Sequence, residues 1–338
     1  MRDACGRRDR RWHRESPTTP ATSPAQRPDP VCSTPQGAAR LSNVSTRTIM
    51  KQVLVQGDRA LKPVTGITVL IYHRVGGGSD SEIDLDLDAF RAQLEHLREH
   101  HSVVSLDDAA EILGSTSDAP TSGPTDQSSV VITFDDGTAD FCDHVVPALV
   151  EYDLPATLYA ATHFIDTGEP FPWGAPPASW AGLADAASTG LVTIGSHTHT
   201  HALLDRSDPG NSGDSGNSGD SSNSADLSGP STIGDELDRS IELIGEHIGT
   251  APAHFAYPKA LPGSDAAEAE VRRRFVTAAL ARSRVNRPGH TDLHRLWRTP
   301  IQRSDGHDFF VAKAAGGLRL EGELRNLVAK VKYRGATN

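Results

Sequence analysis

Short apolar runs alternate along the chain with segments whose apolar residues recur at helical spacing. The runs are rich in β-branched and aromatic residues and are bounded by polar or turn residues, which is typical of buried strands. They lie at Ile67–Tyr72, Val130–Phe134, Ala156–Ala160, Leu191–Ile194 and Phe255–Tyr257. We therefore expect several short strands separated by helices.

Three segments carry apolar residues three or four positions apart, as on one face of an amphipathic helix. The first contains Phe90, Leu94 and Leu97, the second runs from Ile233 to Ile248, and the third, between Leu320 and Val331, predicts a C-terminal helix. Strands that alternate with helices predict an α/β fold with parallel strands. In folds of that class, chemistry lies at the C-terminal ends of the strands.

Three polar stretches interrupt this pattern. Residues 1–50 combine nine Arg with four Asp or Glu and six Pro, without hydrophobic periodicity, which predicts a disordered basic N-terminal segment. Residues 114–129 and 208–231 are dominated by small polar residues and predict flexible insertions. We expect one folded domain over residues 62–338 that contains both insertions. A translation start at Met50 is an alternative that the sequence leaves open.

Composition narrows the class of protein. The 338 residues carry a formal net charge of -11, which disfavours binding to a phosphate backbone and makes nucleic acid an unexpected partner. No apolar run approaches the roughly 18 residues of a spanning helix, and no signal peptide is visible, so we expect no integral membrane segment and a cytoplasmic location. The three cysteines, Cys5, Cys32 and Cys142, predict neither a disulfide framework nor a cysteine metal site, and Cys142 is expected to be a buried thiol.

Two adjacent carboxylates follow the predicted strand Val130–Phe134. Asp135 and Asp136 precede Gly137 at a turn, and neighbouring side chains on a turn point in different directions. One of them is then able to ligate a cation while the other acts as a base. The alternative is a solvated Asp-Gly turn without chemistry.

Three histidines follow the predicted strand Leu191–Ile194. His197, His199 and His201 lie within five residues, and imidazole is the commonest zinc ligand. Pairs at i and i+4 share a helical face, whereas pairs at i and i+2 share a strand face, so the spacing does not choose between His197 with His201 and a pair that uses His199. A solvated polar turn is the alternative. With the acidic pair, the cluster fits a metal site of two histidines and one carboxylate.

The segments Ile132–Gly137 and Gly195–His201 resemble the first two motifs of the polysaccharide deacetylase superfamily (NodB-type, carbohydrate esterase family 4). Other segments match in family order, and a Tyr-His pair like that of Tyr72 and His73 occurs on the first strand of some exopolysaccharide deacetylases. These further segments are Ile71–Val75, Phe90–Leu97, Ser179–Trp180, Phe255–Pro258 and Leu296–Pro300.

The resemblance implies a fold, a cofactor and several residue roles. The fold is a distorted (β/α) barrel, and the cofactor is a divalent metal, usually Zn²⁺. The metal ligands would be Asp136, His197 and His201, which leaves His199 as a bystander. Asp135 matches the general base of the family.

The chain departs from the family pattern after the fifth predicted strand. The family motif Pro-Tyr-Gly places a backbone N–H at the oxyanion, but here Pro258 is followed by Lys259 and Ala260. A backbone donor survives this change, so Tyr257 and Lys259 are the candidates for oxyanion or substrate contacts. The late Leu-x-His motif, which often supplies the general acid, has no clear counterpart.

His73 is therefore the candidate general acid, with a packed or hydrogen-bonded histidine as the alternative. By the same resemblance, Arg298 is expected to pair with a carboxylate of the site, and a surface arginine is the alternative. Trp180 and Trp297 are candidates for stacking on sugar rings, although tryptophan is more often part of a core.

Together these features predict a metal-dependent deacetylase that hydrolyses N-acetyl groups of a polysaccharide or another glycan, a hydrolase of carbon-nitrogen bonds other than peptide bonds. The expected partner is the N-acetylated glycan. Related sites hydrolyse O-acetyl esters, cyclic ureides or imides, which are the nearest alternatives. A carbohydrate-binding protein without turnover is an alternative of another class. Family members often act outside the cytoplasm, in contrast to the location expected from the absence of a signal.

Overall fold

The computed structural model describes residues 65–115, 128–204 and 232–316. The predicted N-terminal segment 1–50 and the predicted helix between Leu320 and Val331 lie outside these residues. Of the two predicted insertions, the structure describes only the ends of 114–129, where Gly114 closes one helix and Ser129 opens a strand. The insertion 208–231 lies outside the described residues.

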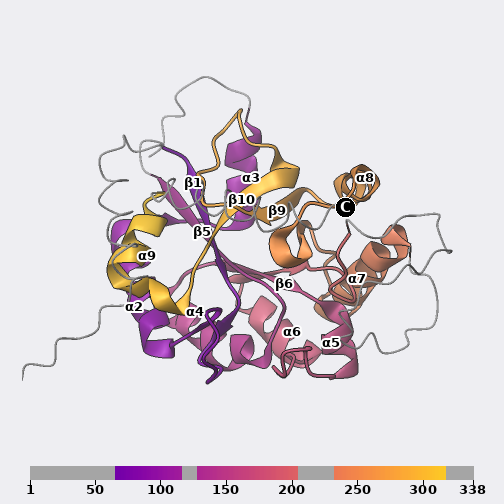
Figure 1. Ribbon diagram of the computed structural model, residues 1–338, viewed down its shortest axis with the longest axis horizontal. Coiled ribbons are helices and arrows are strands. Elements are labelled where there is room, and N and C mark those ends of the chain that lie inside the picture. The colour runs from indigo at the N-terminus through magenta and orange to yellow at the C-terminus, as the bar shows by residue number, and fades with distance from the viewer. Residues whose placement is uncertain (1–64, 116–127, 205–231, 317–338) are drawn as a thin grey trace, which may run out of the picture. The chain divides into compact units, whose positions relative to one another are not determined.

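Parallel strands close into a barrel (Figure 1). In the described residues, seven strands form a ring in the order β1, β10, β9, β8, β7, β6 and β5, and pairing of β1 with β5 closes it. The strands are β1 (Ile67–Tyr72), β5 (Ser129–Phe134), β6 (Ala156–Ala160), β7 (Val192–Ser196), β8 (His254–Ala256), β9 (Thr277–Ala281) and β10 (Leu296–Pro300). The predicted α/β barrel is confirmed.

Three two-residue strands complete the sheets. β1 pairs with one edge of β5 along its whole length. β4 (Ser102–Val103) and β6 therefore share the other edge, where β4 pairs with the start of β5 and β6 with its end. β2 (Arg74–Val75) and β3 (Asp84–Leu85) form a separate parallel pair just after β1. This pair begins at the C-terminal end of the barrel, where the candidate site residues lie.

All five predicted strands are confirmed, with shifts of at most two residues at their ends. Sequence analysis did not identify β9 and β10 as strands. β9 reads Thr-Ala-Ala-Leu-Ala, and alanine favours strands weakly. β10 contains Arg298 and ends at Pro300. In both, barrel closure overrides weak local preference.

Helices lie around the strands (Figure 1). The predicted helices around Phe90–Leu97 and Ile233–Ile248 are confirmed as α2 (Leu87–His100) and α7 (Ile233–Ile248). Asp86 caps α2, Thr232 and Asp235 form a capping box on α7, and Gly249 ends α7 with φ of 84°. The other helices are α3 (Leu106–Gly114), α4 (Val146–Tyr152), α5 (Thr162–Thr167), α6 (Trp180–Ser188), α8 (Asp265–Arg274), α9 (Gly306–Ala314) and the short turns η1 (Phe141–Val145), η2 (Pro258–Ala260), η3 (Leu293–Arg295) and η4 (Arg303–Asp305).

Alternating side chains of the strands divide the core into two layers. Val69, Val131 and Tyr159 come from three different strands yet share one buried cluster, as expected for the interior of the barrel. Leu70 and Ile132, one position along, belong instead to the cluster that contains the apolar face of α2. Burial on both faces explains why these strands are almost continuously apolar.

The structure also bears on the expectations about Cys142 and about membrane-spanning helices. Cys142, expected to be a buried thiol, is only partly buried, and burial raises its pKa to about 11. Among the described helices, none is both long and apolar enough to cross a bilayer.

The packing of α2 on the barrel gives the first prediction. Phe90 is fully buried and meets Tyr72 and Phe134 edge-on, with ring centroids 5.4 and 5.9 Å away. We expect Phe90→Ala to lower the free energy of unfolding by about 3–5 kcal/mol, because it removes an aromatic ring from a close-packed site. Urea denaturation measures this change. Val150→Ala, at a side chain that is 51% exposed, is the matched control and should change stability by less than about 0.5 kcal/mol. Similar losses in the two variants would contradict the packing described.

Candidate metal centre and its cavity

Two segments that contain candidate site residues meet at the C-terminal end of the barrel. Asp135 and Asp136 follow β5, and His197 to His201 follow β7. The backbone is left-handed at Asp136, with φ of 75°, and at His201, with φ of 60°. Such values are uncommon outside glycine and are found where the surrounding structure holds a functional side chain in place.

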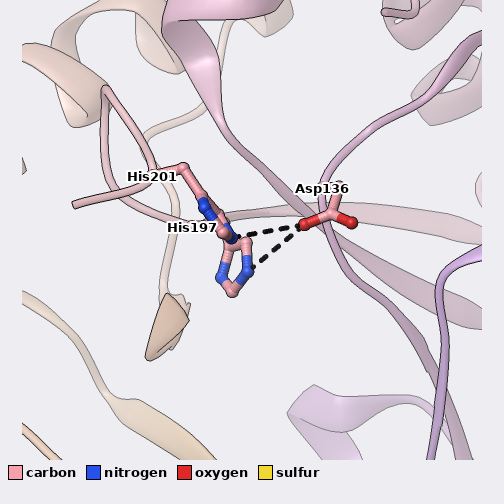
Figure 2. Close-up of side chains that lie close together, drawn as sticks. All are labelled: Asp136, His197 and His201. Atoms are coloured by element: carbon pink, nitrogen blue, oxygen red, sulfur yellow. Dashed lines mark ion pairs between the residues drawn. The ribbon is translucent and has the colours of Figure 1, made fainter. Parts of the chain in front are cut away.

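Asp136, His197 and His201 converge on one point (Figure 2). Asp136 Oδ1 lies 3.6 Å from His197 Nε2 and 3.5 Å from His201 Nε2. In the described part of the chain, this is the group of potential ligands whose donor atoms all lie within 4.8 Å of one another. The arrangement of two imidazoles and one carboxylate is able to hold a divalent cation.

The surroundings of the His197 ring favour a cation at this point. Its Nδ1 lies 2.8 Å from the carbonyl oxygen of Ala256, and a carbonyl only accepts, so Nδ1 carries the proton. The other ring nitrogen, Nε2, is the one that faces Asp136, 3.6 Å from its Oδ1. That nitrogen is buried and has no hydrogen-bond partner among the described residues. A cation between this nitrogen and the carboxylate would satisfy both.

Burial acts in opposite directions on the carboxylate and the imidazole of this group. Desolvation raises the pKa of Asp136. Desolvation, followed by the neighbouring His197, lowers the pKa of His201 to about 3, so its imidazole is neutral at neutral pH. A neutral imidazole is the ligating form, and a bound cation would offset the cost of a buried carboxylate.

His199 points away from this group. Its Nδ1 lies 2.9 Å from the hydroxyl oxygen of Thr162, and its carbonyl accepts from the backbone N–H of His163. His163 also lies 3.6 Å from Glu169. His163 and His199 therefore connect the histidine loop to α5 and lie outside the candidate metal group.

α7 supports the loop that carries the histidines. Glu236 is buried and accepts hydrogen bonds from the backbone N–H and the hydroxyl of Thr200, the latter at 2.9 Å. One turn along the helix, the hydroxyl oxygens of Ser240 and Ser196 lie 2.7 Å apart. These contacts fix the loop between His197 and His201 from the outside of the barrel.

Asp135 is held by a buried arginine. Arg298 is fully buried, and its Nη1 and Nη2 donate to the two carboxylate oxygens of Asp135 at 2.6 and 2.9 Å. The same guanidinium donates to the hydroxyl of Thr133 and lies 5.0 Å above the ring of Tyr159. Burial alone would raise the pKa of Asp135, but Arg298 outweighs it, and the pKa falls to about 2. The expected pairing of Arg298 with a site carboxylate is present in the structure.

A cavity of about 370 Å³ opens above these groups. Asp135, Asp136, His197 and His201 all line it, which places the aspartate pair and the metal group on one surface. The remaining lining residues are Ile71, His73, Ile83, Trp173, Lys259, Ala260, Ala281 and Pro300.

His73 and Lys259, two of the site residues expected from the sequence, line this cavity. His73 follows β1 and is partly buried, and its Nδ1 is buried without a partner among the described residues. Lys259 and the adjacent Ala260 have left-handed backbone, with φ of 54° and 53°. Of the later histidines, His294 is hydrogen-bonded through Nε2 to the carbonyl of Phe275 and does not line the cavity.

The structure does not bring Tyr257 to the cavity. Its ring is buried and packs edge-on against Phe255, with centroids 5.0 Å apart. Its backbone N–H already donates to the carbonyl of Ala279 at 3.1 Å. The expectation of an oxyanion or substrate contact at Tyr257 is corrected accordingly, because β8 turns this side chain outward into the layer under α8.

The two tryptophans expected to stack on sugar rings, Trp180 and Trp297, lie elsewhere in the fold. Trp180 stacks on His247 with centroids 4.5 Å apart, and Trp297 lies under the guanidinium of Arg282. Neither lines the cavity. Trp173, which sequence analysis overlooked, does line it and is 43% exposed. Its signal was a large aromatic residue within the turn-rich stretch Phe171–Pro177.

Comparison with known proteins identifies a matching family model and several structures of similar fold. Residues 122–273 match the protein-family model described as polysaccharide deacetylase. No curated protein matches the chain significantly. Among solved structures, the chain is similar to the deacetylase PplD of Streptococcus pyogenes in complex with acetate, with 18% identity, a TM-score of 0.57, and coverage of 75% of this chain and 99% of that chain.

Two other solved structures show the same fold. IcaB from Ammonifex degensii has 24% identity and a TM-score of 0.58, with coverage of 75% of this chain and 98% of that chain. A de-N-acetylase from Aggregatibacter actinomycetemcomitans has 20% identity and a TM-score of 0.51, with coverage of 73% and 99%. At these identities the likeness establishes the barrel architecture.

The candidate metal group gives the second prediction. A purified sample should hold about one divalent ion at this group, and His197→Ala should reduce its occupancy severely, because only two ligands remain. Elemental analysis after dialysis measures the occupancy. His199→Ala is the matched control from the same loop and should keep the metal. Full occupancy in His197→Ala together with loss in His199→Ala would show that the ligands are chosen wrongly.

Proposed function

The chain belongs to the polysaccharide deacetylase family, and from this membership we propose that it is a metal-dependent hydrolase that removes N-acetyl groups from a glycan. The observation that carries the proposal is the convergence of Asp136, His197 and His201 beside Asp135 on one cavity. This arrangement supplies a cation site and an adjacent base, which are the two requirements for hydrolysis of an amide by activated water.

Asp136, His197 and His201 would hold the cation. When bound, a divalent cation such as Zn²⁺ lowers the pKa of a coordinated water toward about 7 and polarises the acetyl carbonyl. The chain's part is to keep His201 neutral through burial and to orient His197 through its Nδ1 hydrogen bond to the carbonyl of Ala256. Two histidines and a carboxylate leave open positions for water and substrate.

Asp135 is proposed as the general base. It lies next to the metal group, and Arg298 holds both of its oxygens, which fixes the carboxylate in one orientation. Because its pKa is about 2, Asp135 is ionised throughout the neutral range and is ready to accept a proton from the nucleophilic water. Because its pairing with Arg298 makes Asp135 a weak base, we propose that Asp135 contributes to the rate mainly through its position beside the metal group.

His73 is proposed as the general acid. It reaches the cavity from β1, on the opposite side of β5 from the histidine loop, and its buried Nδ1 is without a partner among the described residues. An amide nitrogen leaves only after protonation, so a donor on this wall is required. The Lys259 backbone, strained into a left-handed turn on the cavity wall, is the proposed donor to the oxyanion.

Trp173 is proposed to bind the sugar. It is an exposed aromatic ring on the cavity wall, and its ring centroid lies 6.1 Å from that of His201. Aromatic faces pack well against the apolar faces of sugar rings, and Ile83 and Pro300 add further apolar surface to the cavity. These apolar surfaces suit the face of an N-acetylated sugar ring.

The third prediction separates the base from the metal ligand. Asp135→Asn should keep the metal, while the rate of acetate release from N-acetylglucosamine oligomers falls by roughly two to four orders of magnitude, since the amide cannot accept the proton. Asp136→Asn, the adjacent change of the same size, should instead lose the metal. If Asp135→Asn loses the metal and Asp136→Asn keeps it, the two roles are exchanged.

The fourth prediction concerns His73. An alkoxide leaving from an activated acetyl ester needs little protonation, whereas an amine needs a proton. We therefore expect His73→Ala to reduce acetate release from N-acetylglucosamine oligomers by roughly 100-fold more than from an activated acetyl ester, with the metal retained. His290→Ala, at an exposed histidine away from the cavity, should change neither rate.

Equal losses on the two substrates would remove His73 from the acid role. Release of acetate from O-acetyl esters alone would favour an esterase of the same family. A metal-loaded wild type that binds glycans but releases no acetate from any of them would favour the carbohydrate-binding protein.

A further inference from the structure

Four histidines gather where α2 ends and α9 begins, outside the cavity described above. The ring centroid of His96 lies 4.6 Å from that of His100, 5.4 Å from that of His101 and 5.6 Å from that of His307. His96 and His100 belong to α2, His101 caps its C-terminus, and His307 lies in the first turn of α9. α2 and α9 pack side by side (Figure 1).

The spacing on α2 places two of these rings on one face. Residues at i and i+4 are neighbours on a helix surface, so His96 and His100 lie one above the other. The first turn of α9 then adds His307 from across the contact between the helices. Paired histidines at i and i+4 on a helix, completed by a ligand from another element, form a recurrent transition-metal geometry.

His96 is the centre of the cluster and has an unused nitrogen. Its Nε2 is buried and has no hydrogen-bond partner among the described residues. The edge contact of its ring with Phe310, at a centroid distance of 6.1 Å, holds the ring against α9. A buried imidazole nitrogen without a partner is costly, and a ligand that accepts its lone pair removes that cost.

The cluster favours neutral imidazoles. Burial lowers the pKa of His96, and His100 and His307 lower it further, against the nearby Glu99, which raises it. Burial and then His96 and His100 lower the pKa of His101 to about 4.

We propose that His96, His100 and His307 bind a divalent transition metal of borderline softness, such as Zn²⁺, at a site separate from Asp136, His197 and His201. In the described residues the nitrogens of the cluster do not yet lie within 4.8 Å of one another as those of the Asp136 group do. His100 and His307 are exposed, so a change of staggered rotamer at each would bring their ring nitrogens toward Nε2 of His96. Such an ion links α9 to α2.

The link between α2 and α9 would also affect the cavity, through a contact of α9 with the cavity wall. The ammonium of Lys313, on α9, donates to the carbonyl of Pro300 at 2.6 Å, and Pro300 lines the cavity. A metal that fixes α9 against α2 therefore also steadies one wall of the site.

Zinc stoichiometry of the full-length chain tests the proposal. Protein stripped of metal is dialysed against buffered Zn²⁺ and analysed for bound metal. We expect the double variant His100→Gln/His307→Gln to bind about one ion fewer per chain than the wild type, or to bind it at least roughly 10-fold more weakly. Both side chains are exposed, so the melting temperature without metal should stay at the wild-type value.

Two further variants separate this site from the catalytic one. His197→Ala should lose a different ion, so that combining it with His100→Gln/His307→Gln removes about two ions in all. His290→Gln, an exposed histidine outside the cluster, is the matched control and should lose none. His100→Gln with native His307 should give an intermediate affinity.

Equal zinc stoichiometry and affinity in the wild type and in His100→Gln/His307→Gln would overturn the proposal. That result would leave the proposed deacetylase function untouched, because the catalytic ion is counted separately through His197→Ala. Conversely, a chain that lacks deacetylase activity but loses one zinc ion in His100→Gln/His307→Gln supports the second site alone.

Discussion

Closure of the barrel between β1 and β5 is the constraint on which the candidate site depends. β1 pairs with β5 through six residue pairs, from Ile67 with Ser129 to Tyr72 with Phe134, and with β10 on its other edge. This pairing turns a row of parallel strands into a ring whose C-terminal ends face one another. Side chains that follow β1, β5, β7 and β8 consequently share one cavity, although the sequence positions that they occupy extend from His73 to Lys259.

Within that ring, burial of charge limits which residues are tolerated. A fully buried arginine is stable only when its charge is paired and its donors are satisfied, and Arg298 achieves this with Asp135, Thr133 and the ring of Tyr159. Asp136 has no comparable cation among the described residues, and its burial raises its pKa. The two adjacent aspartates therefore have opposite environments. One is compensated by a buried arginine, and the other belongs to the candidate metal group.

Backbone strain is concentrated around the same cavity. In the described residues, six positions other than glycine have positive φ, and four of them, Asp136, His201, Lys259 and Ala260, line the cavity. Each costs of order 1–3 kcal/mol and persists only where the surroundings fix it. Hydrogen bonds from α7, through Glu236 and Ser240, supply that support for the histidine loop. At these positions the fold therefore holds side chains and backbone on the cavity wall at a cost in conformational free energy.

Local sequence pattern by itself determined five strands, the helices α2 and α7, and the aspartates and histidines of the candidate site. These features depend on periodicity within a few residues, which hydrophobic burial and strand geometry impose directly. The pattern did not reveal β9 and β10, because their alanine-rich or arginine-containing sequences become strands only through pairing with neighbours already in the ring.

Tertiary structure alone decided which side chains face the cavity. His199 turns toward Thr162, while His201 turns toward Asp136. The spacing of the histidines left this choice open, and the left-handed backbone at Thr198 and His201 accompanies it in the fold. Tyr257 points out of the barrel, and Trp173 replaces the expected tryptophans on the cavity wall. Such directions depend on where each strand lies in the ring and on contacts between residues far apart in the chain, and no short segment contains that information.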